Sequence, residues 1–83
     1  MPTGLYRFHC TDGRDLVVDL RGKRMPTLAL VRLHAERVAL DLMVRGPRIN
    51  WSAWQVEVYD KHGRVVLTKA FTDVRYDLRS ARG

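Results

Sequence analysis

The chain has 83 residues, of which 46% are hydrophobic and 29% are charged. That length and composition indicate one small folded domain, and they argue against wholesale disorder and against a large enclosed pocket. No stretch of the sequence approaches the roughly 20 apolar residues that a membrane span needs. The net charge of +6 favours contact with phosphates or other polyanions. The one cysteine, Cys10, cannot form an internal disulfide, and nothing at the N-terminus reads as a secretion signal. We expect a cytoplasmic protein of bacterial type.

Two strands forming a hairpin are predicted at the N-terminus. Residues 5–10 alternate in character, and the side with two aromatics, Tyr6, Phe8 and Cys10, should point inward. Residues 11–15 have the composition of a turn. Residues 16–20 predict a second strand, with its apolar side chains sharing one face: Leu16, Val18 and Leu20.

The longest periodic stretch, residues 27–44, predicts an α-helix. Its apolar residues recur at spacings of three and four, on a side that should face the sheet: Leu28, Val31, Ala35, Val38, Ala39 and Leu42. Pro26 keeps the helix from starting earlier, and Thr27 is the predicted N-cap. At the other end Arg45, Gly46 and Pro47 form a helix stop, with Gly46 suited to the left-handed conformation.

A second hairpin follows the helix. Trp54, Val56 and Val58 should share the inward face of a strand, and residues 60–63 form a turn in which Gly63 takes a positive φ. Residues 65–71 predict the fourth strand, with one apolar face: Val65, Leu67 and Phe71.

These elements predict an α+β fold of order ββαββ. We expect a mainly antiparallel four-stranded sheet with one helix packed on a face, in a single domain of residues 1–83. The ordered core should span about residues 5–73. The basic tail, residues 74–83, contains Arg75, Arg79 and Arg82, and its last residues should be mobile.

No motif for catalysis, a cofactor or a metal site is found. His9 and Cys10 are adjacent on a strand, so their side chains point to opposite faces and cannot hold one metal ion. Cys10 reads as a buried small hydrophobic residue, and His9 as a polar residue on the outer strand face. The carboxylates Asp12, Asp15 and Asp19 flank a turn and read as a solvated hairpin end. We therefore expect a protein that is not an enzyme.

Basic residues gather before and after the predicted helix and are candidates for contact with phosphates: Arg21, Lys23, Arg24, Arg45 and Arg48. A helix of 18 residues spans about 27 Å, so the two groups should lie at opposite ends and not form one patch. Exposed aromatic residues are sparse. Because the basic residues favour contact with phosphates but exposed aromatics are few, we keep binding to nucleic acid or another polyanion as the alternative function.

The helix carries a second apolar strip that a single core does not require: Leu30, Leu33, Leu40 and Val44. Arg37 lies within this strip, between Leu33 and Leu40. The hairpins could wrap far enough around the helix to bury this strip. Otherwise the strip is an interface, most simply with a second copy of the chain, and exposed sheet edges offer another route to pairing. Our leading hypothesis is a non-catalytic interaction module that forms a homodimer.

The order of the turn motifs resembles a family of small bacterial proteins known as domain of unknown function number 6894. The residues that carry the resemblance are Phe8 and His9, Asp12 and Gly13, Asp19 and Gly22, Pro26, then Asp60, Gly63, Arg64, Val65 and Phe71. The likeness covers about residues 5–73. This chain differs in having Arg24 and Thr27 where acidic residues are common in the family. The resemblance supports the fold and implies no activity.

Overall fold

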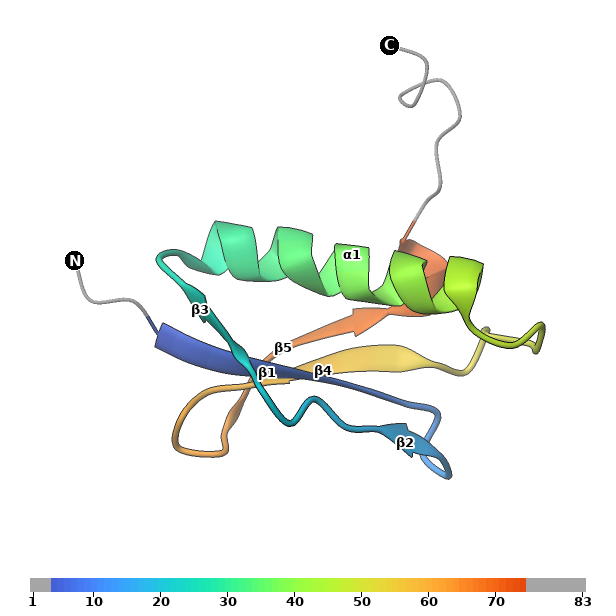
Figure 1. The fold of residues 1–83 in the computed structure, drawn as a ribbon, viewed down its shortest axis with the longest axis horizontal. Coiled ribbons are helices and arrows are strands. Elements are labelled where there is room, and N and C mark those ends of the chain that lie inside the picture. The colour runs from blue at the N-terminus through green and yellow to red at the C-terminus, as the bar shows by residue number, and fades with distance from the viewer. Residues whose placement is uncertain (1–3, 75–83) are drawn as a thin grey trace, which may run out of the picture.

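The computed structural model describes residues 4–74 and places one α-helix against one face of an antiparallel sheet (Figure 1). The elements in chain order are β1 (Gly4–Thr11), β2 (Leu16–Val17), β3 (Lys23–Met25), α1 (Leu28–Arg45), β4 (Gln55–Tyr59), β5 (Val65–Ala70) and the 3₁₀ helix η1 (Phe71–Asp73). The α+β class is confirmed, with five strands in place of the predicted four. Apart from Val74, the predicted basic tail, with Arg75, Arg79 and Arg82, lies outside the described residues.

The sheet is organised around β1, which pairs with three other strands. The order is β2-β1-β4-β5, and β3 pairs with the start of β1. Cys10 is opposite Val17 in β2, whereas Tyr6 is opposite Lys23 in β3. Residues 16–25 therefore run back along β1 as one strand interrupted in its middle.

The interruption explains why the strand predicted at residues 16–20 is wrong beyond Val17. The Asp19 carboxylate accepts hydrogen bonds from the backbone N–H groups of Phe8, Arg21 and Gly22, at 3.0 to 3.1 Å. These bonds bend the chain out of the ladder, and Gly22 takes a φ of 72° to complete the bend. The apolar face expected at residues 16–20 is consequently exposed, with Leu20 at 83%.

The helix runs one residue later than predicted, and Thr27 caps it as expected. The Thr27 hydroxyl accepts a hydrogen bond from the Leu30 N–H at 3.2 Å. Leu28, the first residue of α1, is 62% exposed and does not join the core, contrary to the prediction that it faces the sheet. The left-handed conformation predicted for Gly46 is also wrong, because its φ is −81°. Glycine is required there because a Cβ would collide with the Leu42 carbonyl oxygen.

The core lies between α1 and the sheet. Its buried members come from every layer of the fold: Phe8, Cys10, Met25, Val31, Ala35, Ala39, Trp54, Val56, Val58 and Phe71. Small alanines on α1 let the helix approach the sheet closely, and β-branched valines on β4 fill the space beneath it. Trp51 covers one end of this core, with its ring stacked on Phe71 at a centroid distance of 5.7 Å.

The second hairpin forms largely as predicted. The Asp60 carboxylate accepts from the N–H groups of His62 and Arg64, and Gly63 has a φ of 76°. A bulge between Val58 and Tyr59 shifts the register of β4 against β5. The strand ends at Ala70, and Phe71 reaches the core from η1 instead of from β5.

Candidate interaction surface

The side of α1 that faces away from the sheet carries what we call the outer strip: Leu30, Leu33, Arg37, Leu40 and Val44. At 3.6 residues per turn, these positions lie about half a turn around the helix from its buried alanines. Leu30, Leu33 and Val44 are 42%, 59% and 67% exposed, and Leu40 is half-buried. The hairpins therefore do not wrap around the helix, and the alternative in which they bury this strip is wrong.

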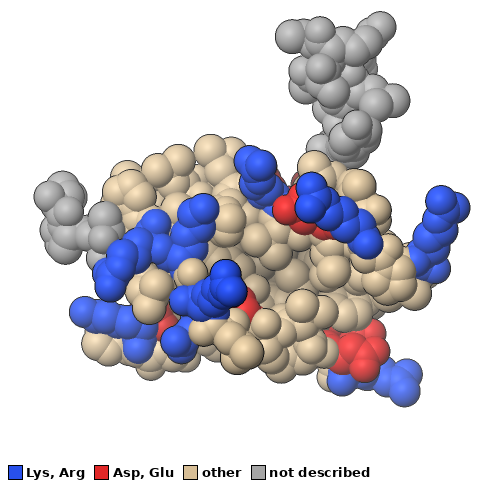
Figure 2. All heavy atoms as spheres, in the orientation of Figure 1, with Lys and Arg blue, Asp and Glu red and all other residues tan. Residues whose placement is uncertain are grey.

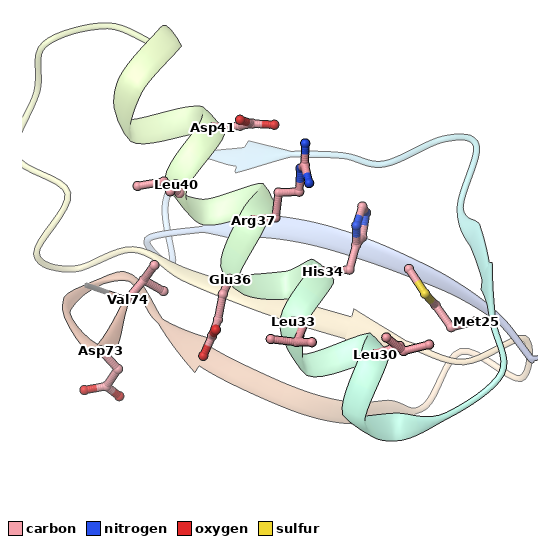
Figure 3. A pocket seen from close by; sticks show the side chains of 10 residues that line it. All are labelled: Met25, Leu30, Leu33, His34, Glu36, Arg37, Leu40, Asp41, Asp73 and Val74. Carbon is pink, nitrogen blue, oxygen red and sulfur yellow. The ribbon is translucent and has the colours of Figure 1, made fainter. Parts of the chain in front are cut away.

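A shallow hollow of about 850 Å³ follows the outer strip (Figure 3). Met25, at the end of β3, and Val74, after η1, contribute apolar side chains to its margins. Arg37 lies between His34 and Asp41 on one side of the helix, while Leu33 and Leu40 point toward the other side (Figure 3). The surface thus has an apolar half beside a polar half.

The polar half carries little net charge. Arg37 and Asp41 are four residues apart, which places them one helical turn from each other. Burial lowers the pKa of His34, and the nearby cations Lys23 and Arg37 lower it further, so this imidazole is neutral at pH 7. On the flank of the apolar half, Glu36 pairs with Lys69 of β5 at 3.2 Å. That ion pair fastens the helix to the sheet edge.

The five basic residues predicted to contact phosphates are all exposed, and three of them line one depression. Arg21, Lys23 and Arg45 line a second depression of about 540 Å³, which we call the side cleft; it lies between α1 and residues 17–23. Arg24 and Arg48 are not part of its lining. Figure 2 shows this face, with Lys and Arg atoms on both sides of a central hollow.

The two basic groups lie toward opposite ends of α1, as predicted from its length, but one cleft along the helix joins three of their members. Residues 16–25 run back along β1 beneath α1, so Arg21 and Lys23 are carried along the helix toward Arg45. The cleft also has an apolar lining, which the sequence did not indicate: Phe8, Cys10, Val17, Val18, Val38 and Leu42. Its only signal was a pair of adjacent valines, of which Val17 ends β2 and Val18 follows it.

The three carboxylates of the first hairpin do not form a cluster, and Asp19 is partly buried and bonded to the backbone. Burial alone would raise the pKa of Asp19, but the backbone donors of Gly22, Phe8 and Arg21 outweigh it and lower the pKa. Asp12 instead caps the turn, accepting from the N–H groups of Arg14 and Asp15. Both carboxylates hold the backbone in place.

The sheet face opposite α1 carries a small polar network. Glu57 accepts hydrogen bonds from Gln55 at 2.7 Å and from the Tyr59 hydroxyl at 3.0 Å. The bond to Glu57 raises the pKa of Tyr59. Among residues 4–74, no group of three or more His, Cys, Asp or Glu side chains is placed to hold a metal ion. Cys10 is buried, and burial raises the pKa of its thiol to about 11, so the thiol is neutral.

Comparison with known proteins assigns the chain to a family. Residues 5–72 match the family model described as Domain of unknown function (DUF6894). The chain belongs to this family. No curated protein and no solved structure matches the chain.

The residues by which the sequence resembles DUF6894 have structural roles in this chain. Phe8 and His9 on β1 are bonded to Asp19, and Gly22 completes that bend. Other members of the set cap the two hairpin turns, precede the helix or fill the core. These residues of the motif therefore contribute to how this chain folds.

Within the described part of the chain, no helix has both the length and the apolarity that crossing a bilayer requires.

Proposed function

We propose that this DUF6894 domain is a non-catalytic interaction module, and that two copies associate through their outer strips. The observation that supports this proposal is the exposure of three large apolar side chains of the strip in a domain whose core is already complete without them. Large side chains aligned on one exposed face are a common mark of a protein interface.

The spacing of the outer strip favours another helix as the partner. Its members follow one another at intervals of three, four, three and four residues, which is the seam of a two-helix coiled coil. The seam continues over about four turns of the helix, with Arg37 at its middle position. A second copy of α1 supplies a matching seam, because a two-fold axis places the same surface on both sides of the contact.

Arg37 sets the geometry of the contact. It occupies the middle of the seam, where a charged residue lowers affinity but restricts the alignment of the two helices. Glu36 and Asp41 flank it on either side of the seam, so a partner helix offers carboxylates within reach of the guanidinium. The expected dimer is therefore modest in affinity and defined in register.

Sedimentation of the full chain at tens of micromolar tests this proposal. The wild type should sediment as a dimer, and Leu33→Glu/Leu40→Glu should sediment as a monomer with unchanged circular dichroism, because four carboxylates would meet in the seam. Should that variant fail to fold, Val44→Glu replaces a side chain that is 67% exposed and tests the same surface.

Leu20→Glu/Leu28→Glu is the matched control. It makes the same chemical change at two other exposed leucines, neither of which belongs to the outer strip. This variant should remain dimeric. A wild type that is monomeric throughout, or a control that dissociates as fully as the strip variant, would rule out association through this surface.

Contact with nucleic acid through phosphates is a second candidate function. It is favoured by the gathering of Arg21, Lys23 and Arg45 around one cleft in a chain of net charge +6. Binding to a short duplex should weaken steeply between low and moderate salt, since each phosphate contact releases counterions. Affinity that does not change with salt would contradict this candidate.

A further inference from the structure

The side cleft combines an apolar lining with a cationic margin. Its interior is formed by Phe8 and Cys10 of β1 and by the flank of α1 that carries Val38 and Leu42. Val17 and Val18 line its outer lip, and both remain about half exposed to solvent. Its volume of about 540 Å³ is within the range of small-molecule sites.

The cations that line the cleft outnumber its two carboxylates, Asp19 and Asp41. Asp19 already accepts three backbone hydrogen bonds, and Asp41 lies one helical turn from Arg37 on α1. Among the described residues, no ion pair engages Arg21, Lys23 or Arg45. The margin therefore has capacity for an anionic group from outside.

The two ends of the cleft differ in polarity. At one end, Arg45 and Gly46 form the C-terminus of α1, where backbone carbonyls carry partial negative charge that Arg45 offsets. At the other end, Lys23 lies near the neutral His34. An anionic group is therefore favoured near Lys23 and Arg21, and an apolar group farther along the cleft.

We propose that the side cleft binds a small amphiphilic anion, with its apolar body against Val38 and Leu42 and its anionic head at Arg21 and Lys23. The carboxylate of a short aliphatic or aromatic acid has this chemistry. The site is separate from the outer strip, so it stands independently of self-association.

Titration with three eight-carbon probes, octanoate, octanol and octylammonium, tests the proposal. The amide resonances of the ¹⁵N-labelled full chain would be followed in two-dimensional NMR spectra. Octanoate should shift the resonances of residues 17–23 and 38–46 and reach saturation. Octylammonium should bind at least about tenfold more weakly than octanoate, because its head is positively charged and is repelled by the cations of the cleft margin.

Lys23→Gln and the matched control Arg24→Gln test whether octanoate binding depends on a cation that lines the cleft. The two residues are adjacent on β3 and both exposed, but only Lys23 lines the cleft. Lys23→Gln should weaken octanoate binding about three- to tenfold, as expected for loss of one charge-assisted contact. Arg24→Gln should leave it unchanged. Val18→Asn should weaken all three probes, since it alters the apolar lip without changing charge.

Several results would overturn the proposal. These are equal affinity for octanoate and octylammonium, equal effects of Lys23→Gln and Arg24→Gln, shifts confined to the outer strip, and a linear response without saturation. Repeating the octanoate titration on Leu33→Glu/Leu40→Glu separates this site from self-association. That variant should bind octanoate as the wild type does, whether or not the wild type is a dimer.

Discussion

The Nδ1 atom of His9 accepts a hydrogen bond of 2.9 Å from the backbone N–H of Asp19. The Asp19 carboxylate in turn accepts the Phe8 N–H at 3.1 Å, so side chain and backbone exchange bonds across β1 and the segment after β2. A neutral imidazole with its proton on Nε2 fits this role. The clamp joins residues that are ten positions apart in the chain, and it determines where β2 ends.

Replacing Asp19 should therefore cost more stability than replacing its neighbours. Asp19→Ala removes the acceptor of three backbone N–H groups and should lower the free energy of unfolding by about 2 kcal/mol. Asp15→Ala is the control, since that side chain is exposed, and its effect should stay within about 0.5 kcal/mol. Urea denaturation measures both. Equal midpoints for the two variants would show that the clamp does not stabilise the fold.

The same carboxylate should make the free energy of unfolding depend on pH in the acidic range. The unfolded pKa of Asp19 is near 3.8, and its folded pKa is lower, so its contribution is complete above the unfolded value and is lost as pH falls through the folded value. The stability difference between wild type and Asp19→Asn should therefore be constant from pH 7 to about pH 5 and shrink below about pH 4. Comparing the two proteins cancels the other acidic groups. A difference that does not change down to pH 2.5 would contradict this assignment.

Gly46 should be sensitive to substitution although its φ is ordinary. Gly46→Ala places a methyl group against the Leu42 carbonyl oxygen and should destabilise the fold by about 1 to 3 kcal/mol. Gly63→Asn is the comparison, because Gly63 has a φ of 76° and open space around it. Asparagine adopts that conformation readily, so its cost should be below about 1 kcal/mol. Thermal melts that rank the two variants in the reverse order would be inconsistent with the close approach at Gly46.

Phe71 should be the most costly aromatic to truncate. It is buried among Trp51 and Trp54, and its N–H is bonded to the Trp54 carbonyl at 3.0 Å. Phe71→Ala should lower stability by about 3 to 5 kcal/mol, enough to unfold much of so small a domain. Leu20→Ala, at an 83% exposed site, should leave the circular dichroism spectrum and melting temperature near those of the wild type. Loss of structure in both variants would count against a core centred on Phe71.

The sequence predicted elements well wherever one local signal was decisive. Thr27 followed by a periodic run placed the helix start to within one residue, and the alternation of Trp54, Val56 and Val58 identified the inward face of β4. It failed where a long-range contact overrode the local pattern. The alternation after Leu16 indicates a strand, but Asp19 bonds to β1 and ends that strand early.

Of the two candidate sites, only one could be predicted from the sequence. The outer strip could be read from spacing along α1, because a helix fixes which side chains share a face. The side cleft could not, because its lining comes from segments whose proximity depends on the sheet topology. The path of residues 16–25 beneath α1 brings Lys23 to the same cleft as Leu42, and no local pattern encodes that path.

The burial of Cys10 has a consequence for how copies of this chain can assemble. It is the only thiol in the sequence, it is 1% exposed, and it remains protonated in ordinary buffers. Thiolate is the form that reacts with oxidants and disulfides, so covalent cross-linking between folded copies is suppressed. Any association between folded copies should therefore be insensitive to reducing agents.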